Sequence, residues 1–181
     1  MQVIVISNVS ITDVSNLARY GVKGAQAATW LTKHGVKIPE VANTWVLHEQ
    51  TLVMRLGSTE FLIEDQEGGE TCKKLLADTL RVANVYKVPR ADAAYLLAGS
   101  AVPNLLSELC ALDLSETALL ENDVMMTQVA SISATILRQT LNGETVYRLW
   151  CDGTYGVYMQ HVLDELTVEL SITVAGFQAV N

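Results

Sequence analysis

Residues 19–31 read RYGVKGAQAATWL. The first part alternates loosely between apolar and polar positions and predicts a β-strand over residues 17–23. Gly24 follows, and a glycine at such a junction permits a tight turn and a close approach of the backbone. Apolar residues then recur at helical spacing, which predicts a helix over residues 25–34 with Gly35 as its C-terminal stop. The stretch is therefore typical of a strand–glycine–helix unit.

The same unit recurs further along the chain. Residues 95–99 (YLLAG) align with residues 20–24 (YGVKG) at an offset of 75, so Gly99 falls on Gly24. A second helix is predicted over residues 101–109, directly after this glycine. The alternative to a true repeat is a chance likeness between two short strand–glycine–helix units.

The repeat predicts how the domain is organised. We expect a single domain over residues 1–181 with pseudo-duplicated halves, about 1–84 and 85–181. A second correspondence sets Gly153 on Gly57 at an offset of 96. It predicts that the second half has gained about 21 residues (96 − 75), roughly the length of a hairpin.

Apolar periodicity and turn signals place the remaining elements. Two further helices are predicted over residues 70–83 and 160–170. Asn142-Gly143 is a strong signal for a hairpin between two strands. The other predicted strands lie at residues 3–6, 44–47, 51–56, 60–63, 85–88, 94–98, 124–130, 133–139, 145–150, 155–159 and 171–174. The predicted fold class is α+β, with two related strand–helix–strand halves and antiparallel sheets.

The composition limits the classes of function. Of the 181 residues, 50% are apolar and 18% are charged, which provides a filled core and argues against disorder. The formal net charge is −8 and the longest basic run is Lys73-Lys74, so no nucleic-acid partner is expected. The apolar N-terminal stretch is too short for a membrane span or a signal peptide. Free thiols are the simplest interpretation of Cys72, Cys110 and Cys151, and they indicate a cytoplasmic protein.

No pattern in the sequence indicates catalysis. The chain lacks glycine-rich phosphate-binding loops and the GxSxG nucleophile elbow. His34, His48 and His161 have no Cys or His at metal-ligand spacing. Carboxylates cluster at residues 64–67 and 116–123, where solvated loops are expected. We therefore predict no catalytic residue and no metal site.

Four residues are candidates for a partner interface: Arg19, Tyr20, Trp45 and Arg55. Aromatic and arginine side chains are enriched where protein interfaces concentrate their binding energy. A core position is the alternative for Trp45, and a plain surface charge is the alternative for each arginine.

Several short motifs, taken in order, carry a resemblance to a known family. They are RYGVKG at 19–24, ATWL at 28–31, Asn43-x-Trp45, RLGSTEFL at 55–62, CALDLS at 110–115 and Thr127-Gln128. With these motifs, spread over about residues 11–170, the chain resembles the gamma subunit of heterotetrameric sarcosine oxidase.

The resemblance implies both a fold and a function. That family is similar to a reduced aminomethyltransferase, the glycine-cleavage T-protein, whose fold itself contains related halves. The implied role is a non-catalytic gamma-type subunit of a cytoplasmic heterotetramer. This complex demethylates sarcosine oxidatively, in sarcosine catabolism, and passes a one-carbon unit to tetrahydrofolate. FAD, FMN and NAD would be bound by the larger flavin-bearing alpha and beta subunits, and none of them by this chain.

The folate site of the aminomethyltransferases offers a finer comparison. Their Gly-Glu-x-Gly-Phe-Glu block matches residues 153–158, where both glycines remain but Thr154 and Tyr158 stand in place of the carboxylates. A neutral Thr does not accept the paired donor hydrogen bonds that a carboxylate takes from a pterin. A stand-alone folate-binding or aminomethyltransferase-like protein, with tetrahydrofolate as ligand, is the alternative function. A divergent relative with another binding or structural role is a further alternative.

Overall fold

The structure, a computed structural model, describes residues 9–178, so the strand predicted at residues 3–6 lies outside the described residues. The described chain forms two compact units. Unit 1 runs from residue 9 to Val14, over Asp92–Glu121, and from Met125 to residue 178. Unit 2 comprises Ser15–Ala91 and Asn122–Val124.

The described part of unit 2 is an antiparallel sheet covered by two helices. Its elements are β2 (Arg19–Lys23), α1 (Ala27–Lys33), β3 (Thr44–His48), β4 (Thr51–Arg55), β5 (Glu60–Asp65), α2 (Thr71–Ala77) and β6 (Tyr86–Val88). The strand order is β3-β4-β5-β2-β6. Trp30 and Leu31 of α1 and Leu75 of α2 belong to the same buried cluster as Val53 and Ile63 of the sheet. Both helices therefore cover one face of the sheet.

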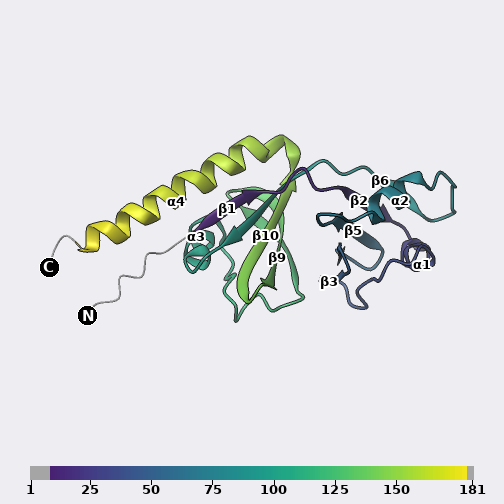
Figure 1. Cartoon of the computed structure of the whole chain (residues 1–181), viewed down its shortest axis with the longest axis horizontal. Coiled ribbons are helices and arrows are strands. Elements are labelled where there is room, and N and C mark those ends of the chain that lie inside the picture. Colours follow the sequence, from purple (N-terminus) through teal and green to yellow (C-terminus); the bar gives the residue numbers. More distant parts are fainter. Residues whose placement is uncertain (1–8, 179–181) are drawn as a thin grey trace. The chain divides into compact units, whose positions relative to one another are not determined.

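The described part of unit 1 has the same plan. Its elements are β1 (Ser10–Asp13), β7 (Asp92–Ala98), α3 (Val102–Leu109), β8 (Val124–Val129), β9 (Ile132–Leu141), β10 (Glu144–Asp152), the 3-10 turn η1 (Gly153–Tyr155) and α4 (Gly156–Gln178). The strand order is β1-β7-β10-β9-β8. Leu105 of α3 and Leu163 of α4 are buried in one cluster with Tyr147 and Leu149 of β10. Figure 1 shows both helices beside the strands of this sheet.

Each sheet takes one of its edge strands from the other half of the chain. The order β6-β2-β5-β4-β3 matches β1-β7-β10-β9-β8 position by position. However, β1 precedes β2 in the chain and pairs with β7, whereas β6 precedes β7 and pairs with β2. The first strand of each predicted half thus completes the sheet built by the other half. This topology supports the proposal that the chain is a duplication of one unit.

The glycines of the predicted repeat occupy equivalent places. Gly24 joins β2 to α1 and Gly99 joins β7 to α3, and both have φ of +118°. Strand pairing extends the correspondence, because Tyr20 pairs with Ile63 and Tyr95 pairs with Leu149. The offset between the halves is therefore 75 from β2 to β7 and 86 (149 − 63) from β5 to β10. The second half has thus gained 11 residues (86 − 75) between these two strands.

The predicted match of Gly57 with Gly153 is wrong. Gly57 lies between β4 and β5, whereas Gly153 follows β10 and opens the turn before α4. The insertion of about 21 residues that this match predicted is wrong for the same reason. Asp-Gly and Gly-Ser signals mark turns of many kinds, and the sequence does not state which strands a turn connects.

Three predicted elements also differ from the structure. Residues 155–159 and 171–174, predicted as strands, belong to α4. The Asp152 side chain accepts hydrogen bonds from the backbone N–H and the hydroxyl of Thr154, so Asp152-Gly153 starts a helix rather than a hairpin. The helix predicted over residues 70–83 ends at Ala77, because the Asp78 side chain accepts from Leu80 N and holds the next residues in a turn.

Replacement of the first junction glycine tests this account of the fold. Gly24→Ala is expected to lower the free energy of unfolding by about 2 kcal/mol or more. The reason is that a Cβ would lie 2.2 Å from Asn84 O on a backbone with φ of +118°. Urea denaturation measures the change.

Gly57→Ala is the matched control, since a Cβ at Gly57 meets no atom within 4 Å. It should change stability by less than about 0.5 kcal/mol. Equal effects of the two substitutions would contradict the role of the Gly24 junction.

Candidate functional site

Arg19, the first of the predicted interface residues, is part of a buried ion pair. Its Nε lies 2.7 Å from Glu64 Oε2, and the two side chains are 3% and 0% exposed. Arg19 also donates to the backbone oxygen of Ser15. The corresponding pair in unit 1 is Ala94 opposite Trp150. Unit 2 therefore has a charged pair where unit 1 has an apolar one.

Tyr20 is buried between the sheet and α1. Its ring stacks on Trp30 with centroids 6.3 Å apart. Burial, with the nearby Asp78 carboxylate, raises the pKa of Tyr20 to about 12. The counterpart Tyr95 donates its hydroxyl to Gly156 O at 2.7 Å, whereas the Tyr20 hydroxyl has no hydrogen-bond partner among the described residues. A buried hydroxyl without a hydrogen-bond partner lowers the stability of the fold, so packing within unit 2 does not explain why a tyrosine stands here.

Trp45 and Arg55 are likewise engaged within unit 2. Trp45 is buried opposite Met54 of β4. The Arg55 guanidinium lies 5.5 Å from the centroid of the Phe61 ring. It also donates to backbone oxygens of two loops, at Pro39, Glu40, Gly57 and Ser58. All four predicted interface residues thus have contacts inside unit 2, and their place at a partner surface stays a prediction.

The buried ion pair gives a stability prediction. Glu64→Gln should lower the free energy of unfolding by about 3–5 kcal/mol, because Arg19 would remain buried without its carboxylate. The exposed pair formed by Lys23 and Glu60 is the control, at 50% and 34% side-chain exposure. Glu60→Gln should cost less than about 1 kcal/mol. Urea titration of both variants measures this, and similar losses would contradict the special weight of the buried pair.

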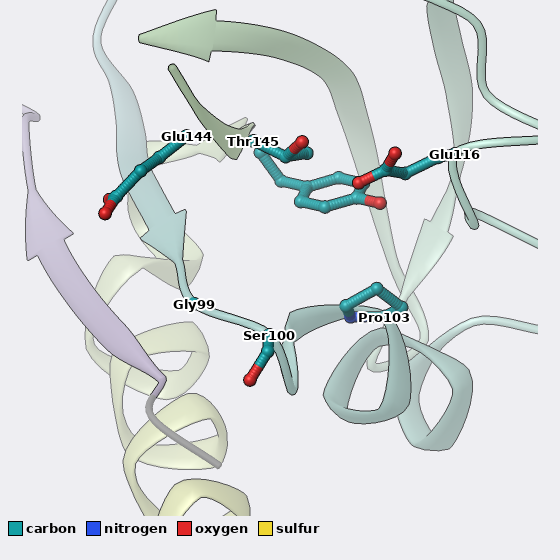
Figure 2. Close-up of a pocket in the computed structure, with 7 residues that line it drawn as sticks. Gly99, Ser100, Pro103, Glu116, Glu144 and Thr145 are labelled. Atoms are coloured by element: carbon teal, nitrogen blue, oxygen red, sulfur yellow. The ribbon is translucent and has the colours of Figure 1, made fainter. Parts of the chain in front are cut away.

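A pocket of about 290 Å³ lies in unit 1 at the start of α3. Figure 2 shows its labelled lining residues, which are Gly99, Ser100, Pro103, Glu116, Glu144 and Thr145. Tyr147 completes the lining, and its buried hydroxyl has no partner among the described residues. Burial, followed by the Glu116 carboxylate, raises the pKa of Tyr147. Carboxylates and hydroxyls together suit a small ligand that donates hydrogen bonds or carries positive charge.

A larger groove, which we call the 76–90 groove, lies in unit 2 with a volume of about 1140 Å³. Its lining residues are Arg19, Tyr20, Leu76 and the continuous run from Asp78 to Arg90. No groove is expected from the sequence, because residues 70–83 are predicted to continue as a helix with a buried apolar stripe. Two of the predicted interface residues, Arg19 and Tyr20, do line it.

The cysteines do not form a reactive site. Cys72, Cys110 and Cys151 are free, as predicted, and all three are buried. Burial, with the Asp65 carboxylate, raises the pKa of Cys72 to about 12. Burial, with the Asp92 carboxylate, raises the pKa of Cys151 to about 11. The thiolate, which is the nucleophilic form, is therefore scarce at neutral pH.

Thiol labelling tests this arrangement. At pH 8 the folded chain should react with Ellman's reagent at least about a hundredfold more slowly than the chain in urea, since burial disfavours the thiolate. Because the folded pKa values of Cys72 and Cys151 are raised, these two thiols also favour folding below pH 9, and this contribution is lost as the pH rises further. Labelling of the folded chain at the rate seen in urea would contradict the burial of these thiols.

The described residues contain neither a cluster of metal ligands nor a helix suited to cross a membrane. No group of three or more His, Cys, Asp or Glu side chains in this part of the chain is placed to hold a metal ion. None of the helices within the described residues has the length and apolar character needed to cross a bilayer.

The fold defines the class of protein to which this chain is similar. No protein-family model matches the chain, and no curated protein matches it in sequence. Among solved structures, the chain matches heterotetrameric sarcosine oxidase from Corynebacterium sp. U-96, determined in complex with pyrrole 2-carboxylate, with a TM-score of 0.72 and 22% identity. The match covers 92% of this chain and 87% of that chain.

A second match links the fold to the aminomethyltransferases. Glycine cleavage system aminomethyltransferase T from Bartonella henselae matches with a TM-score of 0.61 and 16% identity. The match covers 87% of this chain but only 45% of the aminomethyltransferase. The α+β fold class with antiparallel sheets is confirmed, and so is the predicted resemblance to these two proteins at the level of the fold.

Proposed function

We propose that this chain is a non-catalytic, gamma-type subunit of a sarcosine-oxidase-like flavoenzyme complex in the cytoplasm. The observation that carries the proposal is the extent of the structural match. It takes in 87% of a chain of heterotetrameric sarcosine oxidase, against 45% of the aminomethyltransferase. A subunit of similar size and fold is a closer counterpart than part of a larger transferase.

In this proposal the chain contributes structure to the assembly, while the larger alpha and beta subunits hold FAD, FMN and NAD. The complex would demethylate sarcosine oxidatively, with tetrahydrofolate receiving the one-carbon unit. Arg19, Tyr20, Trp45 and Arg55 stabilise the sheet, a helix or a loop of unit 2 itself.

Co-expression with the larger flavin-bearing chains of the same organism tests the proposal. We expect one stoichiometric species in size-exclusion chromatography with light scattering, with sarcosine-dependent hydrogen peroxide formation. Omission of this chain should reduce the yield of assembled complex. Separate elution of this chain at micromolar concentrations would contradict the proposal.

The alternative, a stand-alone folate-binding protein, draws support from the fold shared with the aminomethyltransferase. Residues 153–158, which match the folate-binding block of the aminomethyltransferases, form η1 and the first turn of α4. There the Thr154 hydroxyl donates to Asp152 Oδ1 at 2.6 Å, and Tyr158 is exposed. Thr154 is thus engaged in starting the helix, which favours the subunit proposal.

Isothermal titration with tetrahydrofolate distinguishes the two functions. Under the subunit proposal we expect no binding heat at high micromolar ligand, because the carboxylates that would hold a pterin are replaced. Saturable binding with a stoichiometry of about one would favour the alternative, and Asp152→Ala would then show whether this stretch is the site.

A further inference from the structure

Large apolar side chains are concentrated on the segment that runs from the end of α2 to β6. Leu76, Leu80, Val82 and Tyr86 are 63%, 73%, 41% and 61% exposed. All four line the 76–90 groove. Scattered exposed apolar residues are ordinary, but several on one continuous segment mark a surface that another molecule covers.

The charge at the groove is opposite to that of the chain. The whole sequence has 20 acidic and 12 basic residues. At the groove, Arg81 and Lys87 are exposed cations, and Asp78 is the acidic residue of the lining. The Lys87 ammonium group donates to Asp78 O and lies 5.5 Å from the centroid of the Trp30 ring, so Arg81 is the more available of the two cations. The Asp78 carboxylate lies 3.0 Å from His34 Nε2, and its pKa is held below the usual value, first by the Leu80 N–H that it accepts. The groove therefore combines apolar and cationic character on an acidic protein.

The edge strand β6 limits how a partner polypeptide would contact the groove. β6 is an edge strand, and edge strands are common templates for pairing with a partner strand. Here β6 has three residues, includes Lys87, and is followed directly by Pro89. Lysine and proline on an edge disfavour strand addition. A partner would thus bind through side chains that contact the apolar residues, rather than by extending the sheet.

The volume of the groove lies just above the range of small-molecule pockets, and its exposed apolar side chains favour a polypeptide. Ligand pockets are usually about 300–1,000 Å³ and enclose their ligand. The 76–90 groove has about 1140 Å³, and its apolar side chains extend into solvent at the rim. The buried Tyr20 hydroxyl lies in its lining without a partner among the described residues.

We propose that the 76–90 groove is the docking surface for a segment of a larger partner polypeptide, whose apolar side chains are flanked by carboxylates. The apolar residues match Leu76, Leu80, Val82 and Tyr86, and the carboxylates match Arg81 and Lys87. The inference rests on the proposed function, since it names the face through which this chain joins the complex.

Paired apolar substitutions test the surface. Binding of the full-length chain to the co-purified larger flavin-bearing chains is measured by biolayer interferometry. Leu76→Ser with Leu80→Ser should raise the dissociation constant at least about thirtyfold, as loss of an interface hot spot does. Val41→Ser with Leu47→Ser is the matched control within unit 2, since these residues are 65% and 45% exposed. The control should change binding by less than about threefold. Circular dichroism melting shows whether each variant keeps its fold.

A charge reversal tests the second feature of the surface. Arg81→Glu should weaken binding at least about tenfold at low salt and reduce its dependence on salt between about 50 and 300 mM NaCl. Lys37→Glu makes the same change of charge at an exposed position away from the groove lining, and it should leave binding nearly unchanged.

The outcomes separate this inference from the function on which it rests. If the wild-type chain binds the larger chains and the groove variants bind as well as the controls, the docking surface is wrong and the subunit role stands. If the wild-type chain does not bind, both are wrong. A homodimer of the isolated chain that the groove variants dissociate would instead assign the surface to a second copy and overturn the inference.

Discussion

The fold of unit 2 depends on the close approach between β2 and the segment that ends in β6. A Cβ at Gly24 would lie 2.2 Å from Asn84 O, and a Cβ at Gly21 would lie 2.9 Å from Val88 O. Only glycine leaves room for this backbone, and Gly24 also has a φ that other residues disfavour. The close approach brings β6 onto the edge of the sheet. It thereby places residues 78–90 along β2, where they form the 76–90 groove.

The exchange of edge strands between the two halves makes each sheet depend on both halves of the chain. The first strand of each half completes the sheet of the other half, so neither half supplies its own sheet in full. Pairing between distant segments is slow to form and costs loop entropy. As a result, neither sheet is complete until a strand from the other half has paired with it.

Unit 2 departs from its counterpart at β2 and after β5. The Arg19–Glu64 pair stands where unit 1 has Ala94 and Trp150, and Tyr20 lacks the hydrogen bond that Tyr95 makes to Gly156. The helix after β5 stops at Ala77, whereas the helix after β10 continues to Gln178. Leu76 in the last turn of α2 and Leu80 beyond the helix are both exposed. Both units thus share one strand order, while unit 2 has the apolar and cationic 76–90 groove.

The sequence by itself determined the local units of this protein. The strand–glycine–helix pattern at Gly24 and Gly99, the α+β class and the free thiols all follow from periodicity, glycine and cysteine usage, which act over a few residues. The tertiary structure alone decided which strands pair, that Asp152 starts a helix, and that residues 78–85 leave the helix to line a groove. It also placed Arg19 in a buried ion pair with Glu64. These outcomes depend on contacts between residues far apart in the chain, and no local pattern records such contacts.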